Sequence, residues 1–423
     1  LRKRIVYTFL LILVYRLGSF IVLPGIDPSV IAEFSASMSN RTDALSLLNM
    51  FSGGAFGNVS IFALGVMPYI SASIVVQLLG VFVGKFRKMQ AEESGRRKLN
   101  QITRLLTIVI LCIQGPAYIS NIMHQYPNAF LVSSKLYILA ATVILLGGSM
   151  FVMWLGERIT ERGIGNGISL IIMIGIIARL PQAFMAEVLS KAGSTTGGIL
   201  LLIVEFVILF FVFVAAIALV QAVRKVPVQY ANRVIGNKQY GGVRQYIPLK
   251  VNASGVMPII FAQAIMLFPI IFSRFDATRG FAAAMSNYTG LWYNLVFGFL
   301  VIVFTYFYTA VTFQPNMMAE DMKKNGGFIP GVKPGKKTME YLDTIMTRIV
   351  LPGSIFLAII AVLPAIATLC GVNNQFASFY GGTSLLILVG VVLDTLQQVE
   401  SHLLMRHYDG LMKTGRLTGR SGM

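Results

Sequence analysis

Two glycine motifs are the first places in this sequence where phosphate chemistry could be expected. Gly163–Gly167 has the spacing GxGxG instead of GxGxxG, and it is followed by an apolar run of spanning length where a nucleotide-binding fold would continue as a βαβ unit. Gly335–Thr338 resembles the end of a phosphate-binding loop, but Pro330 stands in place of the first glycine and Lys337 in place of the Ser or Thr. Neither motif therefore predicts nucleotide binding.

Other catalytic patterns are missing from the sequence as well. It contains no HExxH or GxSxG motif and no paired carboxylates on one helix face. Cys112 and Cys370 lie in separate apolar runs, so neither a disulfide framework nor a thiolate metal site is expected, and the 3 histidines leave little for His chemistry. We expect a protein that is not an enzyme and holds no cofactor or metal, so that the energy for any work comes from a partner.

Ionisable residues inside apolar runs are a further kind of chemistry, because they mark ion coupling and proton relays in membrane proteins. Only Arg16, Glu205 and Asp394 are candidates here. Arg16 and Asp394 lie within about two turns of the end of a run, where snorkelling or helix capping is expected, and Glu205 has no obvious partner in the sequence. This is little material for a coupled transporter.

The composition indicates which kind of structural element carries the residues named above. Of the 423 residues, 56% are hydrophobic and 12% are charged, and the mean hydropathy of +0.73 excludes an ordinary water-soluble domain. We predict an all-α polytopic membrane protein with ten transmembrane helices of about 20 residues each. The runs of spanning length are Ile5–Leu23, Val66–Val83, Leu105–Met123, Leu136–Leu155, Ile168–Met185, Gly198–Val223, Gly255–Phe272, Leu291–Phe313, Ile349–Leu369 and Gly381–Val399.

The basic residues orient these runs, because cationic loops stay in the cytoplasm. With both termini in the cytoplasm, 28 of the 35 Lys and Arg fall in cytoplasmic segments and 6 in external ones, and Arg16 lies inside the first run. No cleavable signal is visible, so we expect the first run to be a retained span. The net charge of +18 must lie in the loops, which suggests contact with polyanions or anionic lipid.

Ten spans divide into two halves of five, and the sixth span then starts on the opposite side of the membrane from the first. The halves would therefore be inverted relative to each other. The predicted halves are 1–186, with a glycine-rich segment at about 47–64, and 198–423, with long basic loops at about 224–250 and 314–348.

Two sequence echoes support this internal repeat. Gly65–Ile70 (GVMPYI) and Gly255–Ile260 (GVMPII) differ at one position, and Gly167–Ile172 (GISLII) is echoed by Gly382–Ile387 (GTSLLI). Each echo pairs one span with the span five later. Because glycine and proline breaks inside a span are tolerated where they face protein or a water-filled cavity, we expect these four helices to line a central passage. Close helix packing at the glycines is the alternative.

The segment Leu47–Leu64 is too rich in glycine and too polar for a lipid-facing helix, especially at Phe51–Asn58 (FSGGAFGN). Two interpretations are open: an external loop, or a short re-entrant segment folded into the mouth of the protein. The segment is weakly charged and runs directly into the second span. We therefore favour the re-entrant segment.

In their order along the chain, these segments resemble the SecY family, the large subunit of the bacterial protein-translocation channel. The resemblance extends from Ile5 to the C-terminal tail. The stretches that carry it are Arg16–Phe20, Pro24–Asp27, Asn49–Gly54, Ile61–Ser73, Glu93–Lys98, Ile159–Ser169, Pro330–Gly335 and Tyr380–Leu386.

The resemblance implies an hourglass pore between two inverted halves, a short re-entrant helix that plugs the outer funnel, and a ring of aliphatic side chains at the waist. A narrow apolar constriction excludes water and ions by dewetting and offers no specific grip on a passing peptide. By position, the pore ring would be Val66, Ile70, Ile172, Ile260 and Ile387. The plug residues would be Asn49, Phe51, Gly53, Gly54 and Phe56.

The resemblance also implies a lateral gate, formed by spans two and three against spans seven and eight, with Gln77 as a polar gate residue. An ordinary interhelical hydrogen bond of Gln77 is compatible with that role. The two basic loops would dock the ribosome and the motor ATPase SecA. The docking residues would be Arg233, Lys238, Arg244, Lys333, Lys336 and Lys337. Lys333 and Asn237 replace the family's usual arginines, and a lysine keeps the charge but lacks the planar fork of a guanidinium.

The function implied is a channel that translocates unfolded polypeptides across the bacterial plasma membrane and releases hydrophobic segments laterally into the bilayer. The implied partners are the small subunits SecE and SecG, SecA, the ribosome with its RNA and proteins, signal-sequence-bearing preproteins and anionic lipids. The alternative is a secondary solute transporter with inverted repeats, which should show polar or charged substrate ligands near the midplane. An intramembrane enzyme would need a nucleophile or a metal cluster, and the predicted waist has neither kind of residue.

Overall fold

In the computed structural model, the chain folds into two compact units. The first unit holds the described residues up to Pro181 and those from Gly390 onward, and the second holds Gln182–Val389. The residues described are 2–31, 34–35, 49, 51–84, 86, 89, 93–131, 135–192, 198–230, 233–235, 238–240, 244–266, 285 and 289–414.

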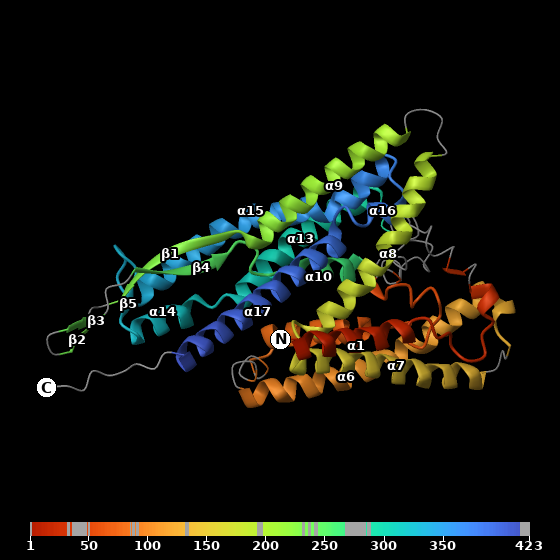
Figure 1. Ribbon diagram of the computed structural model, residues 1–423, viewed down its shortest axis with the longest axis horizontal. Helices are drawn as coiled ribbons and strands as arrows, with labels where there is room; N and C mark the ends of the chain where they lie inside the picture. The colour runs from red at the N-terminus through yellow and green to blue at the C-terminus, as the bar shows by residue number, and fades with distance from the viewer. Residues whose placement is uncertain are drawn as a thin grey trace. The chain divides into compact units, whose positions relative to one another are not determined.

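The first unit is built from long helices that pack side by side (Figure 1). Helix α6 packs against both α4 and α7, and α1 packs against α7. Leu23, Val59, Ile119 and Leu145 form part of a core that ties the ends of these helices together. The elements are α1 (Arg2–Gly18), α4 (Met67–Phe82), α6 (Glu93–Gln125), the short 3-10 helix Pro127–Ala129, α7 (Lys135–Arg162), the first part of α8 (Gly167–Ala192) and the last part of α17 (Gly382–Thr414).

The second unit contains a helical part and a small β-structure. Helix α13 packs against α10 and α15, and α14 packs against α15. Its helices, besides the remaining parts of α8 and α17, are α9 (Gly198–Gln221), α10 (Met257–Met266), α13 (Leu291–Thr312), α14 (Pro315–Lys324), α15 (Lys336–Leu369) and α16 (Asn374–Ala377).

Seven helices among the described residues are long and apolar enough to cross a membrane. They correspond to seven of the predicted spans. The other three spans are represented by the shorter helices α1, α4 and α10, and the predicted seventh span continues past Met266 into residues outside the described ranges. Helix α9 is apolar except for Glu205 and the terminal Gln221, and only 11% of its most apolar window is buried, as expected for a helix that faces lipid.

The glycines of the two echoes mark where helices begin, which confirms the predicted breaks. Gly65 (φ +50) and Gly255 (φ +63) adopt left-handed conformations that suit glycine, and α4 and α10 begin two residues later with a proline in the first turn. In the second echo, α8 begins at Gly167 and α17 at Gly382. In each echo, therefore, the two helices begin at the same position of the repeated sequence.

The basic loops contain strands that the sequence analysis did not predict. Val226 and Val228 of β1 are buried while Pro227 between them is exposed, and this alternation is typical of a strand with one covered face. An antiparallel sheet with the order β4-β1-β5 results, in which Gln229 pairs with both Arg244 and Phe328. The strands are β1 (Val223–Tyr230), β4 (Arg244–Lys250) and β5 (Gly327–Phe328), and a separate ribbon consists of β2 (Arg233–Ile235) and β3 (Lys238–Tyr240).

Candidate functional site

The plug segment, which we define as the described residues from Asn49 to Leu64, is folded into the interior of the first unit. Phe51, Ala55 and Val59 are at most 8% exposed. The described residues after Phe51 form successive turns instead of the short helix that the resemblance implied. Glycines are responsible, since Gly53 and Gly54 have φ values of +64 and +94, which a right-handed helix cannot include.

Internal hydrogen bonds hold these turns. Asn49 accepts the Gly57 amide on Oδ1 at 2.8 Å and the Gly54 amide on its carbonyl at 2.9 Å. The Ser52 hydroxyl accepts the Phe56 amide at 3.0 Å and donates to the Asn49 carbonyl at 3.1 Å. A buried turn needs such partners because water cannot reach its backbone. The plug segment is therefore an ordered structure of its own.

The plug segment is also tied to the surrounding helices. The Tyr15 hydroxyl of α1 donates to the Ser52 carbonyl at 3.2 Å. The Tyr118 hydroxyl of α6 donates to the Phe56 carbonyl at 2.6 Å, and the Tyr118 and Phe56 rings lie 4.6 Å apart. These contacts bury the segment among the helices of the first unit, and its re-entrant position in the membrane stays a prediction.

The five residues of the predicted pore ring belong to different units. Val66 and Ile172 are buried in the first unit, where Ile70 is half-buried on α4. In the second unit, Ile260 is half-buried on α10 and Ile387 is 6% exposed on α17. The convergence of the five side chains on one ring stays a prediction.

Gln77 lies on α4 with its amide only partly satisfied. Nε2 donates to the Ser73 hydroxyl at 3.4 Å within the same helix. Oε1 is buried and has no hydrogen-bond partner among the described residues. The interhelical hydrogen bond considered for Gln77 is therefore not among its described contacts, and its gate role stays a prediction.

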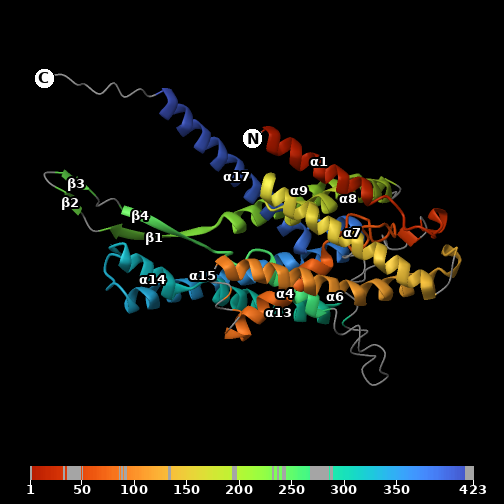
Figure 2. The ribbon, with the colours of Figure 1, turned by 90° about the horizontal axis from the view of Figure 1, so that it is seen from below.

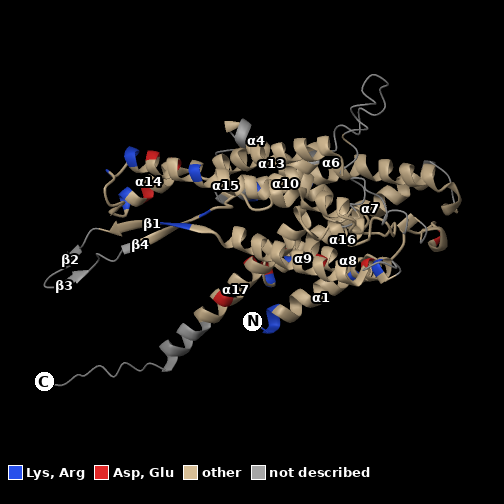
Figure 3. Cartoon of the chain, turned by 90° about the horizontal axis from the view of Figure 1, so that it is seen from above, with Lys and Arg blue, Asp and Glu red and all other residues tan. Residues whose placement is uncertain are grey.

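The two basic loops share one apolar core. Val226 and Val228 from β1 pack with Met322 of α14 and with Leu342 and Met346 of α15. Figure 2 shows β1 and β4 as a ribbon beside α14 and α15. Figure 3 shows Lys and Arg at the start of β1 and on α14, where Asp and Glu lie beside them. The loops therefore form one structured, basic surface.

Lys333 and Lys336 are exposed on this surface: Lys333 lies in the turn before α15, and Lys336 is the first residue of that helix. The turn is held by the Thr338 hydroxyl, which donates to the Lys333 carbonyl at 3.0 Å. Lys337 forms an exposed ion pair with Glu340 at 3.2 Å. The other predicted docking residues, Arg233, Lys238 and Arg244, lie on strands, but their side chains, like Asn237, are outside the described part of the chain.

The ionisable residues found inside apolar runs have different surroundings. Arg16 donates a hydrogen bond to the Gly53 carbonyl in the plug segment at 2.7 Å. Asp394 is exposed and lines an open cavity of about 600 Å³ together with Arg4 and His402. Glu205, for which no partner was found in the sequence, pairs with Lys191 at 3.0 Å.

Lys191 and Glu205 belong to a buried triad with Glu187, which the sequence analysis missed. The Lys191 ammonium also lies 3.7 Å from the Glu187 carboxylate and donates to the Gly371 carbonyl at 2.9 Å. Glu187 accepts the Asn373 amide at 2.8 Å. The spacing of four residues between Glu187 and Lys191 on one helix is the signal that could have identified half of this triad.

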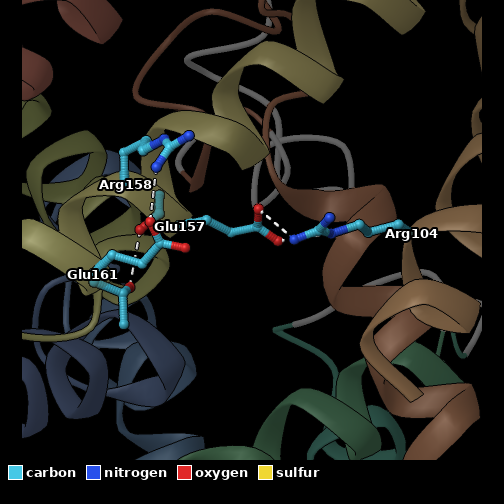
Figure 4. A network of polar contacts seen from close by, with 6 residues as sticks. Arg104, Glu157, Arg158 and Glu161 are labelled. Atoms are coloured by element: carbon cyan, nitrogen blue, oxygen red, sulfur yellow. Dashed lines mark hydrogen bonds and ion pairs between the residues drawn. The ribbon is translucent and has the colours of Figure 1, made fainter. Parts of the chain in front are cut away.

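A different charge arrangement links α6 with α7 (Figure 4). Arg104 donates to both carboxylate oxygens of Glu157, at 3.0 and 2.8 Å, and Arg158 pairs with Glu161 at 2.9 Å. All four side chains are at least a quarter exposed. The Arg104–Glu157 pair joins α6 to α7, whereas Arg158 and Glu161 pair within α7, and we assign neither pair a part in the candidate site.

Comparisons with known proteins identify the family and the fold. A protein translocase subunit SecY from Chlamydia trachomatis is 39% identical over 444 residues, which cover 99% of this chain and 97% of the relative. A solved structure on the plug domain of the SecY protein matches with a TM-score of 0.60 at 17% identity, over 98% of this chain and 94% of the other. A structure of Sec61 in a canine ribosome-channel complex matches with a TM-score of 0.53 at 16% identity, over the same shares.

The fold is therefore that of the protein-conducting channels, multi-pass membrane proteins with a plug. The family model for SecY matches residues 60–396. The chain belongs to the SecY family, whose curated relatives are subunits of the protein translocase.

Proposed function

We propose that the pore ring closes the waist of this channel and opens for unfolded polypeptides. Val66, Ile70, Ile172, Ile260 and Ile387 carry no polar group, so a closed ring would be dry and would block ions. The same side chains would fit loosely around any peptide. The seal would be tight at rest and unselective during transport.

The observation that carries this proposal is the buried position of the plug segment. Gly53 packs against Gly175 of α8, where a Cβ on Gly53 would lie 2.8 Å from the Gly175 Cα. Gly175 follows ring residue Ile172 by three positions on the same helix. The plug segment therefore contacts α8 about one helical turn from Ile172, a residue of the proposed ring, which supports the proposal.

Lateral release of hydrophobic segments is the second part of the proposal. Gln77 lies on α4, one of the helices assigned to the gate, and its Oε1 atom has no described hydrogen-bond partner. An unsatisfied buried oxygen weakens packing at that position. We propose that it lowers the cost of separating the gate helices.

The basic surface is proposed as the docking site for the ribosome and for SecA. Its exposed lysines would bind RNA phosphates with a strong salt dependence, or an acidic protein surface. The canine Sec61 structure was determined in a ribosome-channel complex, which supports the first of these partners. SecE, SecG, signal-sequence-bearing preproteins and anionic lipids complete the proposed partners.

We further propose a location in the bacterial plasma membrane with both termini in the cytoplasm. The distribution of Lys and Arg along the sequence supports this orientation. We also propose that the chain performs no catalysis of its own and depends on the energy of its partners. A solute transporter is not favoured, because the curated relatives are translocase subunits and the proposed ring has no group that would bind a polar solute.

The test is the resting ion conductance of the reconstituted channel. Replacing Ile70 and Ile172 with glycine should make it leak, because both substitutions remove apolar volume from the ring. The control is Ile177→Gly on α8, where the side chain is 41% exposed, since each glycine substitution carries the same helix penalty of about 1 kcal/mol. An unchanged resting conductance of the double variant would reject the ring.

A further inference from the structure

Two arginines meet consecutive residues of the plug segment. Arg16, in the last turn of α1, donates from Nη1 to the Gly53 carbonyl at 2.7 Å. On α8, the Nη2 and Nε atoms of Arg179 lie 3.3 and 3.4 Å from the point that a Cβ on Gly54 would occupy. Both guanidinium groups therefore lie directly against the same turn.

The absence of side chains on Gly53 and Gly54 makes this approach possible. A Cβ on Gly53 would lie 3.1 Å from Arg16 Nη1 and 2.8 Å from the Cα of Gly175. The second of these atoms belongs to a helix backbone and cannot move aside. Both glycines also have positive φ values, which suit glycine. The turn therefore has a left-handed backbone and lies close to Arg16, Arg179 and Gly175.

The surroundings of the two arginines show what replaces water around them, and for Arg16 the replacement includes the plug segment. Both are half-buried. Among the residues that the structure describes, neither forms an ion pair with a carboxylate, although Arg16 also lies over the Phe20 ring at 4.8 Å. A partly buried cation requires acceptors in place of water, and the Gly53 carbonyl supplies one to Arg16. Movement of the plug would remove that acceptor.

We propose that Arg16 and Arg179 form a latch on the Gly53–Gly54 turn and set how often the plug leaves its closed position. The inference rests on the proposed function, since it requires a plug that moves. Arg16 acts through a charge-assisted hydrogen bond, which is stronger than a neutral one. Arg179 acts through the fit of its planar group against Gly54. Both are positioning residues for the plug.

The experiment compares Arg16→Gln and Arg179→Gln in the full channel complex reconstituted in lipid. Two quantities are measured: the resting ion conductance per channel, and the rate at which an impermeant maleimide labels Ala55→Cys. Ala55 is fully buried in the plug segment, and Cys112→Ser and Cys370→Ser remove the other thiols. We expect both quantities to rise about tenfold for Arg16→Gln, the effect of losing one charged hydrogen bond, with partial recovery in Arg16→Lys.

Matched control variants separate an effect at the plug segment from a general effect of the substitution. Arg158→Gln removes an exposed arginine that lies away from the plug segment, and it should change neither quantity. Gly53→Ala should also raise both, whereas Gly326→Ala, with a similar φ of +70 and no atom near its Cβ, should not.

Unchanged conductance and labelling in both arginine variants would overturn the latch, as would a loss of thermal stability alone. If Ile70→Gly with Ile172→Gly leaks while the arginine variants stay silent, only the latch is rejected. If all of these variants stay silent, the proposed function is rejected and the latch with it.

Discussion

Two carboxylates and one ammonium group form a buried cluster in the second unit. The Glu187 and Lys191 side chains are 1% and 13% exposed, and that of Glu205 is 7% exposed. The cluster joins α8 to α9 and, through Gly371 and Asn373, to the segment after α15. A buried charge is tolerated only when it is paired, so each member depends on the others.

Removing Lys191 should therefore be costly. Lys191→Met leaves two buried carboxylates without their cation, and we expect a loss of about 3 kcal/mol in the free energy of unfolding. This loss is measured by thermal or denaturant unfolding of the protein in detergent. The control is Lys337→Met, which breaks an ion pair that is 70% and 46% exposed and should cost less than about 1 kcal/mol. Equal stability of the two variants would contradict the argument.

Sequence reasoning found some of these residues and missed others for a physical reason. The sequence identifies Glu205 as an ionisable residue inside an apolar run, but its partner Lys191 is 14 positions away, and only the packing of two helices brings them together. Arg16 was assigned to snorkelling or capping, because the Gly53 carbonyl that it contacts is 37 residues distant. Local patterns do not encode such pairs.

At the scale of elements, the helix starts were predictable and the strands were not. Gly65 and Gly255 require local backbone conformations, and the prolines that follow fix the first turns of α4 and α10. In contrast, β1 is buried on one face only because α14 and α15 cover it. Its short alternation of two valines was too weak to predict a strand inside a basic loop.

The shared core of the basic loops leads to a prediction about Lys333. Because Lys333 is exposed and outside that core, Lys333→Glu should leave folding unchanged while it reverses a charge at the docking surface. We expect SecA-driven export to fall roughly fivefold, the effect of one lost surface charge contact. Lys98→Glu, an exposed charge reversal on α6, is the control for non-specific effects. Normal export by Lys333→Glu would remove this residue from the docking site.

At the scale of the whole molecule, the family and the helical membrane fold could be predicted from hydropathy and from the ordered motifs. The match to the SecY family model confirms that assignment. The ring is different, because Val66, Ile70 and Ile172 lie in the first unit and Ile260 and Ile387 in the second. No property of one unit determines that all five side chains meet, so the ring has to be tested in the assembled channel.

The most direct measurement is disulfide trapping of a preprotein stalled during transport. Single cysteines at the five ring positions, in a chain without Cys112 and Cys370, are paired with one cysteine in the stalled polypeptide. We expect the same position of the polypeptide to cross-link to all five ring cysteines and not to Ile177→Cys on the exposed face of α8. Reaction with the control alone, or at only one side of the ring, would show that the polypeptide does not pass through this ring.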